Sequence, residues 1–221
     1  MWITRTHGWR DSPTLAYVDW DGLFDDLEDQ LASGWEAERA ALEAESERVR
    51  IARLTLKERL SELARREAEI SATLEDGTVI TGVVHGVGAD WAALVMTNSA
   101  PAWGSVLKVV PLAGDVIWHM RHGELLSSMR STGTASAVRD RMTLGFVLRD
   151  LARRRCALTL RLRTGLVLTG TVDRAGADHL DLALHDLSEP RRANAVRGFR
   201  VVPLTAIAAL STTAQAIAPL L

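Results

Sequence analysis

Apolar residues recur at heptad spacing from residue 21 onward, and this pattern predicts a long amphipathic helix over residues 21–52. Trp35 and Leu42 lie on the apolar stripe, whereas Glu38 and Glu45 occupy the second heptad position. A strict coiled-coil seam needs both positions apolar, so the pattern leaves two interpretations. The stripe packs against the chain's own domain, or it associates with another helix. In the second case Trp35 and Leu42 are the expected partner contacts.

Downstream of this helix, the chain contains the same pattern twice. Residues 53–94 align without a gap on residues 141–182, at a constant offset of 88. Each copy opens with a short helical stripe, and Thr55 and Glu58 in the first copy have the spacing of a capping box. The apolar period then falls to two, which predicts five short strands in each copy. The closing segments KVVPLAGDVI and RVVPLTAIAA recur at a slightly larger offset, so one loop has grown.

Composition is ordinary for a folded soluble protein, with 221 residues, 47% hydrophobic and 24% charged. No stretch approaches the roughly 20 apolar residues of a membrane span, and no signal peptide is visible at the start. A single cysteine, Cys156, excludes an internal disulfide. We therefore expect a cytoplasmic protein that does not bind membranes.

Charge is unevenly distributed, although the net charge is only −2. Residues 1–50 carry five basic and twelve acidic side chains, whereas residues 121–221 carry fifteen basic and eight acidic ones. Nearly all the basic residues are arginines, which is typical of a GC-rich genome. Seven of them are candidate nucleic-acid contacts in the second helix and the enlarged loop: Arg149, Arg153, Arg154, Arg155, Arg191, Arg192 and Arg197. Such a cluster predicts either a phosphate-binding face or pairing with an acidic protein partner.

Residues of catalytic types do not form a recognisable active-site pattern. Asp90 and Asp178 occupy the same position of the two copies, directly after Gly-Ala, where an aspartate usually fixes a turn. His119 and His122 lack a third metal ligand nearby. Cys156 follows an arginine triplet, but its position at a strand entrance favours a buried, inert thiol. We predict no catalytic residues, no metal, no cofactor and no enzymatic activity.

The repeated positions resemble the signature of Sm-like barrels, the fold of the Sm, LSm and Hfq proteins. In this sequence they are Leu74, Gly77, Gly82, Asp90 and Leu94, repeated as Leu162, Gly165, Gly170, Asp178 and Leu182. Gly82 and Gly170 lie inside predicted strands, where a glycine lets a strand bend sharply or lets two backbones approach closely. The resemblance covers about two-thirds of the chain. It implies an α+β, mainly β fold, with an N-terminal helix followed by two tandem Sm-like barrels, each a short helix plus five strands. It also implies self-association through free edge strands, with three chains giving a six-barrel ring, whereas the rival is a monomer with one internal pairing.

The nucleotide-contacting motifs of that family do not carry over. Sm-like proteins usually bind RNA through an asparagine after the aspartate, but this chain has Leu94 and Leu182 there. The tight turn that follows is Pro-Leu in both copies rather than basic. RNA binding is therefore expected through a basic face on the second barrel. Trp103, in a loop of the first repeat, is a candidate partner contact or packs over the barrel mouth. The alternative function is a protein-interaction and oligomerisation scaffold without nucleic-acid binding.

The expected organisation has six parts. They are an irregular arm (1–20), an acidic amphipathic helix (21–52), a first barrel (53–120), a linker (121–140), a second barrel (141–211) and a tail (212–221).

Overall fold

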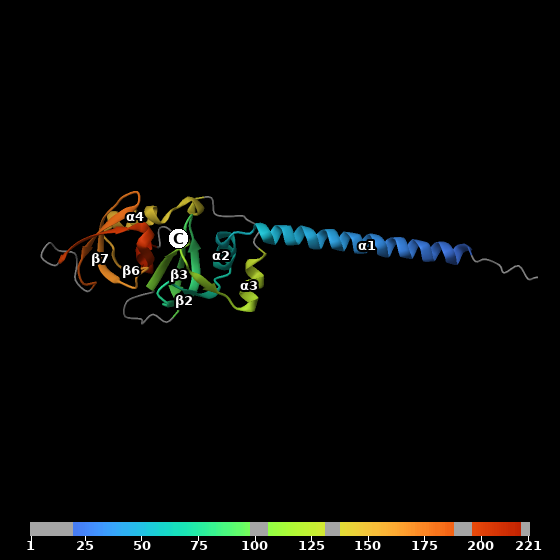
Figure 1. Ribbon diagram of the computed structural model, residues 1–221, viewed down its shortest axis with the longest axis horizontal. Helices are drawn as coiled ribbons and strands as arrows, with labels where there is room; N and C mark the ends of the chain where they lie inside the picture. The colour runs from blue at the N-terminus through green and yellow to red at the C-terminus, as the bar shows by residue number, and fades with distance from the viewer. Residues whose placement is uncertain (1–19, 98–105, 131–137, 188–195, 218–221) are drawn as a thin grey trace, which may run out of the picture. The chain divides into compact units, whose positions relative to one another are not determined.

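The computed structural model describes residues 20–97, 106–130, 138–187 and 196–217. The chain divides into two compact units, Met1–Ala52 and Arg53–Leu221. In the first unit the described residues form a single helix, α1 (Trp20–Arg53), which confirms the expected N-terminal helix (Figure 1). The irregular arm expected over residues 1–20 lies almost wholly outside the described residues.

The second unit contains the helices and strands of both repeats (Figure 1). Its elements, in chain order, are α2 (Leu56–Arg65), β1 (Glu69–Thr73), β2 (Val79–Val87), β3 (Trp91–Met96), β4 (Val106–Pro111), β5 (Ile117–His119), α3 (His122–Ser128), the 3-10 turn η2 (Arg139–Arg141), α4 (Leu144–Arg153), β6 (Ala157–Leu162), β7 (Val167–Ala175), β8 (His179–Leu184), β9 (Gly198–Pro203), the 3-10 turn η3 (Leu204–Ala206), β10 (Ile207–Thr213) and α5 (Ala214–Ile217).

Threonine caps begin the helix of each repeat. The hydroxyl of Thr55 accepts a hydrogen bond from the Glu58 amide, and the Glu58 carboxylate accepts one from the Thr55 amide, which completes the expected capping box. These bonds from Thr55 lower the pKa of Glu58. Thr143 caps α4 in the same way by accepting from the Phe146 amide at 3.3 Å. The repeated helices therefore start at equivalent residues.

The ten strands of the described chain form one antiparallel, unclosed sheet in the order β5-β1-β2-β3-β4-β10-β6-β7-β8-β9. Each repeat contributes five adjacent strands, and its fifth strand pairs with its first. The α+β, mainly β class is thus confirmed. The sheet ends at β5 on one side and β9 on the other.

Two glycines allow strands to approach closely, as the sequence pattern predicted. A Cβ atom on Gly82 would collide with the carbonyl oxygen of Val95, and one on Gly170 with that of Ala183. A β-bulge follows each glycine, where β2 pairs with β3 and β7 with β8. The two repeats therefore bend the same strand at the same place.

Buried apolar residues form two clusters that cross the repeat boundary. The cluster under α2 consists mostly of first-repeat residues but includes Ala208 and Ala209 of β10. The cluster under α4 includes Trp91, Leu107 and Val109 of the first repeat. Each repeat therefore completes its core with side chains from the other.

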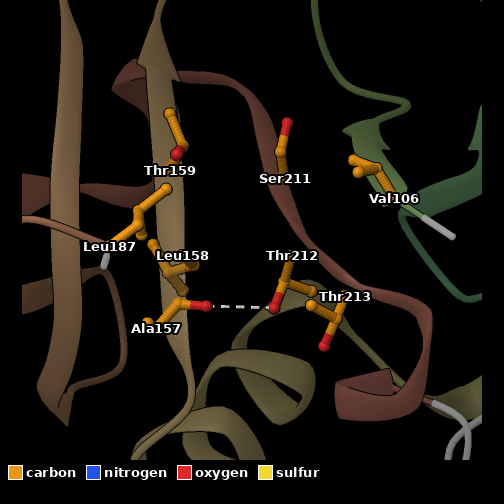
Figure 2. Close-up of a pocket in the computed structure, with 8 residues that line it drawn as sticks. All are labelled: Val106, Ala157, Leu158, Thr159, Leu187, Ser211, Thr212 and Thr213. Carbon is orange, nitrogen blue, oxygen red and sulfur yellow. Dashed lines mark hydrogen bonds between the residues drawn. The ribbon is translucent and has the colours of Figure 1, made fainter. Parts of the chain in front are cut away.

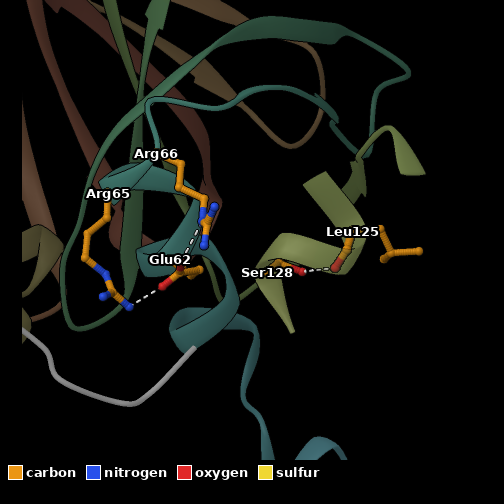
Figure 3. A network of polar contacts seen from close by, with 5 residues as sticks. All are labelled: Glu62, Arg65, Arg66, Leu125 and Ser128. Carbon is orange, nitrogen blue, oxygen red and sulfur yellow. Dashed lines mark hydrogen bonds and ion pairs between the residues drawn. The ribbon is translucent and has the colours of Figure 1, made fainter. Parts of the chain in front are cut away.

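The segment expected to be a linker contains a helix that packs on the first repeat. Arg59 of α2 donates from Nε to the hydroxyl of Ser128 in α3 at 3.1 Å, and Lys57 donates to the carbonyl of Asp140 at 2.9 Å. Figure 3 shows α3 beside α2, where Glu62 is paired with Arg65 and Arg66. The part of the linker at residues 131–137 lies outside the described residues.

Candidate functional site: the junction between the repeats

Strands β4 and β10 join the two repeats edge to edge. They pair antiparallel, with Val109 opposite Leu210 and Val106 opposite Thr213. The side chains of Val109 and Leu210 are fully buried. Since β10 belongs to the second repeat and β4 to the first, this pairing is the main-chain contact that makes one sheet from two repeats.

A turn of the first repeat caps the helix of the second. The Asp90 carboxylate accepts a hydrogen bond of 2.6 Å from the backbone amide of Leu144, the first residue of α4. The carbonyl of Met142 accepts from Trp91 Nε1 at 2.8 Å and from the Ala89 amide at 2.9 Å. Two of the groups at the start of α4 are thus satisfied from the other repeat.

Two ion pairs lie across the same junction. Arg163 NH1 is 2.5 Å from Glu75 Oε1, and Arg161 NH1 is 2.8 Å from Asp76 Oδ2. The Thr78 amide, with Arg161 contributing, lowers the pKa of Asp76. Glu75 and Arg163 are 88 positions apart, so they occupy the same position of the repeat with opposite charge. The junction is therefore electrostatically asymmetric.

The two end strands of the sheet expose residues that are buried at the junction. In β9, Val201 is 68% exposed and Phe199 is 55% exposed, whereas their repeat equivalents Val109 and Leu107 in β4 are fully buried. Ile117 in β5, at the opposite end, is 62% exposed. No described strand pairs with the outer edges of β5 and β9. An exposed apolar strand edge is a template for another strand.

Asp178, the second-repeat copy of Asp90, does not contact a helix in the described chain. Its carboxylate instead lies 2.7 Å from His179 Nδ1. This hydrogen bond lowers the pKa of Asp178 and raises the pKa of His179. That these aspartates fix their own turns stays a prediction, whereas Asp90 makes a long-range contact that its sequence position did not reveal.

Acidic neighbours pair with most of the described arginines that were expected to bind nucleic acid. Asp150 on α4 accepts from both Arg153 and Arg154, and Asp173 on β7 pairs with Arg155 at 2.6 Å. Arg197 pairs with Asp186. Arg149 is exposed on α4, and no described carboxylate pairs with it. The local positive charge is therefore lower than the sequence count suggests.

One detail of the predicted basic cluster needs correction. Arg155 was assigned to the second helix, but α4 ends at Arg153 and Arg155 has a positive φ of 54°. Three residues, Arg154 to Cys156, separate the end of α4 from the start of β6.

Other predicted contact residues lie elsewhere. Arg191, Arg192 and Trp103 fall outside the described residues. Trp35 and Leu42 lie on α1 and are 68% and 65% exposed.

A pocket of about 330 Å³ lies between β4, β6 and β10 (Figure 2). Its described lining is aliphatic and hydroxylic, and includes Val106, Leu158 and Leu187. The Thr212 hydroxyl donates to the Ala157 carbonyl at 3.1 Å, a bond that joins β10 to the start of β6. None of these residues is ionisable, so the lining offers shape and apolar contact but no acid–base chemistry.

Groups with potential reactivity are in structural settings. Burial raises the pKa of the Cys156 thiol despite the nearby Arg154, which disfavours the thiolate. His119 Nε2 is hydrogen-bonded to Thr73 Oγ1 at 2.8 Å. Within the described residues, no group of three His, Cys, Asp or Glu side chains could hold a metal ion. Among the described helices, none combines the length and apolar character needed to cross a membrane.

Comparisons with protein-family models, with curated proteins and with solved structures found no match to this chain.

The sequence analysis did not single out Glu75 and Asp76, which pair with Arg163 and Arg161 across the junction. A usable signal was present, because Glu75 aligns with Arg163 in the repeat. Opposite charges at equivalent positions indicate a contact between unlike copies.

Proposed function

We propose that each repeat is an Sm-like module. The order of a capped helix and five strands, with the fifth strand beside the first, supports this assignment in both copies. So do the strand bends at Gly82 and Gly170, which fall at the positions of the family signature. Two such modules in tandem, each a strongly bent five-stranded unit, then share one sheet through β4 and β10.

The proposed function is non-enzymatic assembly: the chain is a scaffold that polymerises through its own sheet edges. One observation carries it. Val201 and Phe199 at the β9 edge are exposed, whereas the equivalent residues of β4, Val109 and Leu107, are buried in the core cluster that they share with α4 and β10 of the second repeat. Burying apolar area of this kind contributes about 25 cal/mol per Å². Pairing of β9 with β5 of a second copy would remove both exposed edges.

Three chains joined in this way would form a closed ring of six modules. Head-to-tail contacts give a ring when the rotation from each chain to the next adds up to a full turn. A ring leaves no strand edge free. The acidic helix α1, with its exposed apolar stripe, would then be presented once per chain as a partner-binding element.

RNA binding is the second candidate, and the exposure of Arg149 and Arg153 favours it. Arg153 is 78% exposed in its side chain despite its pairing with Asp150. Phosphate contacts of this kind would show a strong salt dependence. Titration with a random single-stranded RNA at low and high salt tests the candidate. Unchanged binding after Arg149→Ala and Arg153→Ala together, or no binding at low salt, would contradict it.

Sedimentation of a Val201→Lys variant tests the scaffold. Lysine on an exposed strand edge leaves the isolated chain intact but blocks pairing, so we expect the assembled species to disappear. Val79→Lys is the matched control. Val79 is 59% exposed. Its repeat equivalent Val167, on β7, remains 43% exposed although the second repeat is joined to the first. Equal assembly of both variants would contradict the proposed edge pairing.

A further inference from the structure

We propose that the Asp178–His179 turn of one chain docks on the N-terminus of α2 in a second copy, and that this contact fixes the orientation of assembly. The proposal rests on the self-association proposed above and specifies its joint. The joint repeats the observed contact between Asp90 and the start of α4. Every chain carries both parts of this joint: the Asp178–His179 turn in the second repeat and the N-terminus of α2 in the first.

The turn that would donate the contact has the same backbone geometry in both repeats. The Gly88 amide bonds to the Trp91 carbonyl at 2.8 Å, and the Gly176 amide bonds to the His179 carbonyl at 2.8 Å. Leu112 donates to the carbonyl of Asp90 at 2.8 Å, as Leu204 donates to the carbonyl of Asp178 at 2.8 Å. The backbone thus places Asp178 as it places Asp90, and the Asp178 side chain, which is bonded to the His179 ring, is 90% exposed.

The ring that follows the aspartate also takes the same place. A Cβ atom on Gly88 would meet the Trp91 indole, and one on Gly176 would meet the His179 imidazole. Both rings therefore fold over the glycine of their own turn. In the junction the indole reaches the carbonyl of Met142, whose repeat equivalent is Leu54 at the start of the first repeat.

The helix end that would accept the contact has the same backbone conformation as the start of α4, although α2 carries the Glu58 carboxylate where α4 has Phe146. Thr55 has φ −81° and ψ 157°, and Thr143 has φ −81° and ψ 161°. Leu144, just after Thr143, is 5% exposed under the first repeat, whereas its equivalent Leu56 is 37% exposed. Among the described residues, no acceptor contacts the Leu56 amide. A carboxylate there would accept from the Leu56 amide and interact favourably with the helix dipole, next to Glu58, which already accepts from the Thr55 amide.

The strand edges that remain free select this joint. Within the chain, β4 of the first repeat is already paired with β10 of the second, so β5 and β9 are the described edges left for another copy. Pairing of β9 with β5 repeats the observed contact and sets a second repeat against a first, as within the chain, where Glu75 meets Arg163. Unlike repeats must therefore alternate along the assembly, which is head to tail.

The observed register predicts the register between chains. In the chain, Leu210 of β10 lies opposite Val109 and Ser211 opposite Lys108. The offset of 92 residues that relates Pro111 to Pro203 also relates β4 to β9 and β5 to β10. Trp118 of a second copy then lies opposite Val201, and His119 opposite Arg200.

Two measurements on the full chain test the joint. The first compares the dissociation constant of Asp178→Ala with that of wild type by sedimentation. Loss of the cap should weaken assembly about fivefold. Asp29→Asn, which removes a negative charge on exposed α1, is the control and should leave assembly unchanged. The second measurement places cysteines at Asp178 and Leu56 in a Cys156→Ala background. Oxidation should then give a ladder of linked chains, absent when either new cysteine is alone.

The outcomes separate the joint from the function on which it rests. A wild-type chain that remains monomeric overturns both. An assembly in which Asp178→Ala changes nothing and the cysteine pair gives no ladder overturns the joint, while edge pairing stands. A ladder together with weaker assembly of Asp178→Ala supports both.

Discussion

Asp90 of the first repeat caps helix α4 of the second through its 2.6 Å hydrogen bond to the backbone amide of Leu144. The bond joins residues 54 positions apart and crosses the repeat boundary. It shows how the two copies of one motif have been made into a single folding unit. A turn aspartate, which in isolation would only order its own loop, here satisfies a helix terminus that the partner repeat leaves open.

Asp90→Ala should therefore destabilise the second unit. The substitution leaves a buried helix amide without an acceptor, at a cost of about 2 kcal/mol in the free energy of unfolding. Asp178→Ala is the matched control, because Asp178 is exposed at the same place of the other repeat. At protein concentrations too low for assembly, Asp178→Ala should lower the free energy of unfolding by less than about 0.5 kcal/mol. Urea denaturation measures both, and equal losses would refute the role given to Asp90.

The pair of Glu75 and Arg163 should show coupling across the junction. Arg163→Glu places two carboxylates together, and Glu75→Arg places two guanidinium groups together, so each single variant should unfold more easily. The double exchange restores the attraction. A double-mutant cycle in urea should give a coupling of about 1 kcal/mol, since both side chains are only partly exposed. Strictly additive losses would mean that the pair contributes nothing.

Gly82→Ala should be among the most damaging small substitutions in the chain. The added methyl group would overlap the carbonyl of Val95, and β2 would have to move away from β3. We expect the free energy of unfolding to fall by about 3 kcal/mol.

Gly34→Ala in α1 provides the opposite case, because nothing lies within 4 Å of the added atom and alanine favours a helix. Helicity measured by circular dichroism should rise in that variant and the unit Arg53–Leu221 should be unaffected. A harmless Gly82→Ala would be inconsistent with the close strand approach.

His179 should titrate above its usual value of 6.5, because its hydrogen bond to Asp178 favours the protonated ring. The sign of the linkage follows from this direction. The stabilisation is fully present below pH 6.5 and is lost as the pH rises through the raised pKa of the folded state. Nuclear magnetic resonance of the imidazole protons measures the titration. Asp178→Asn should bring it back toward 6.5, and an identical curve in both proteins would exclude the pairing.

Local elements were predictable from the sequence, because their causes are local. The heptad stripe gave α1, and the spacing of Thr55 and Glu58 gave the start of α2. Alternation of apolar residues predicted the strands, and Gly82 was correctly expected to allow a close backbone approach.

The junction could not be predicted in the same way. The repeat shows which positions are equivalent, but a strand pattern does not say which edge it will pair with. The contact of Asp90 with Leu144 depends on that pairing, and so does the burial of Val109. The ion pairs of Asp150 with Arg153 and Arg154 differ from the junction in this respect, because residues three and four positions apart on a helix are neighbours and the pairing follows from the local sequence.

The mass of the full chain in solution tests the central claim most directly. Light scattering across micromolar concentrations should give a particle of three times the 24.1 kDa chain, with Val201→Lys reduced to the mass of a single chain. A wild-type mass of one chain at every concentration would contradict the proposal that the free edges β5 and β9 join copies of this protein.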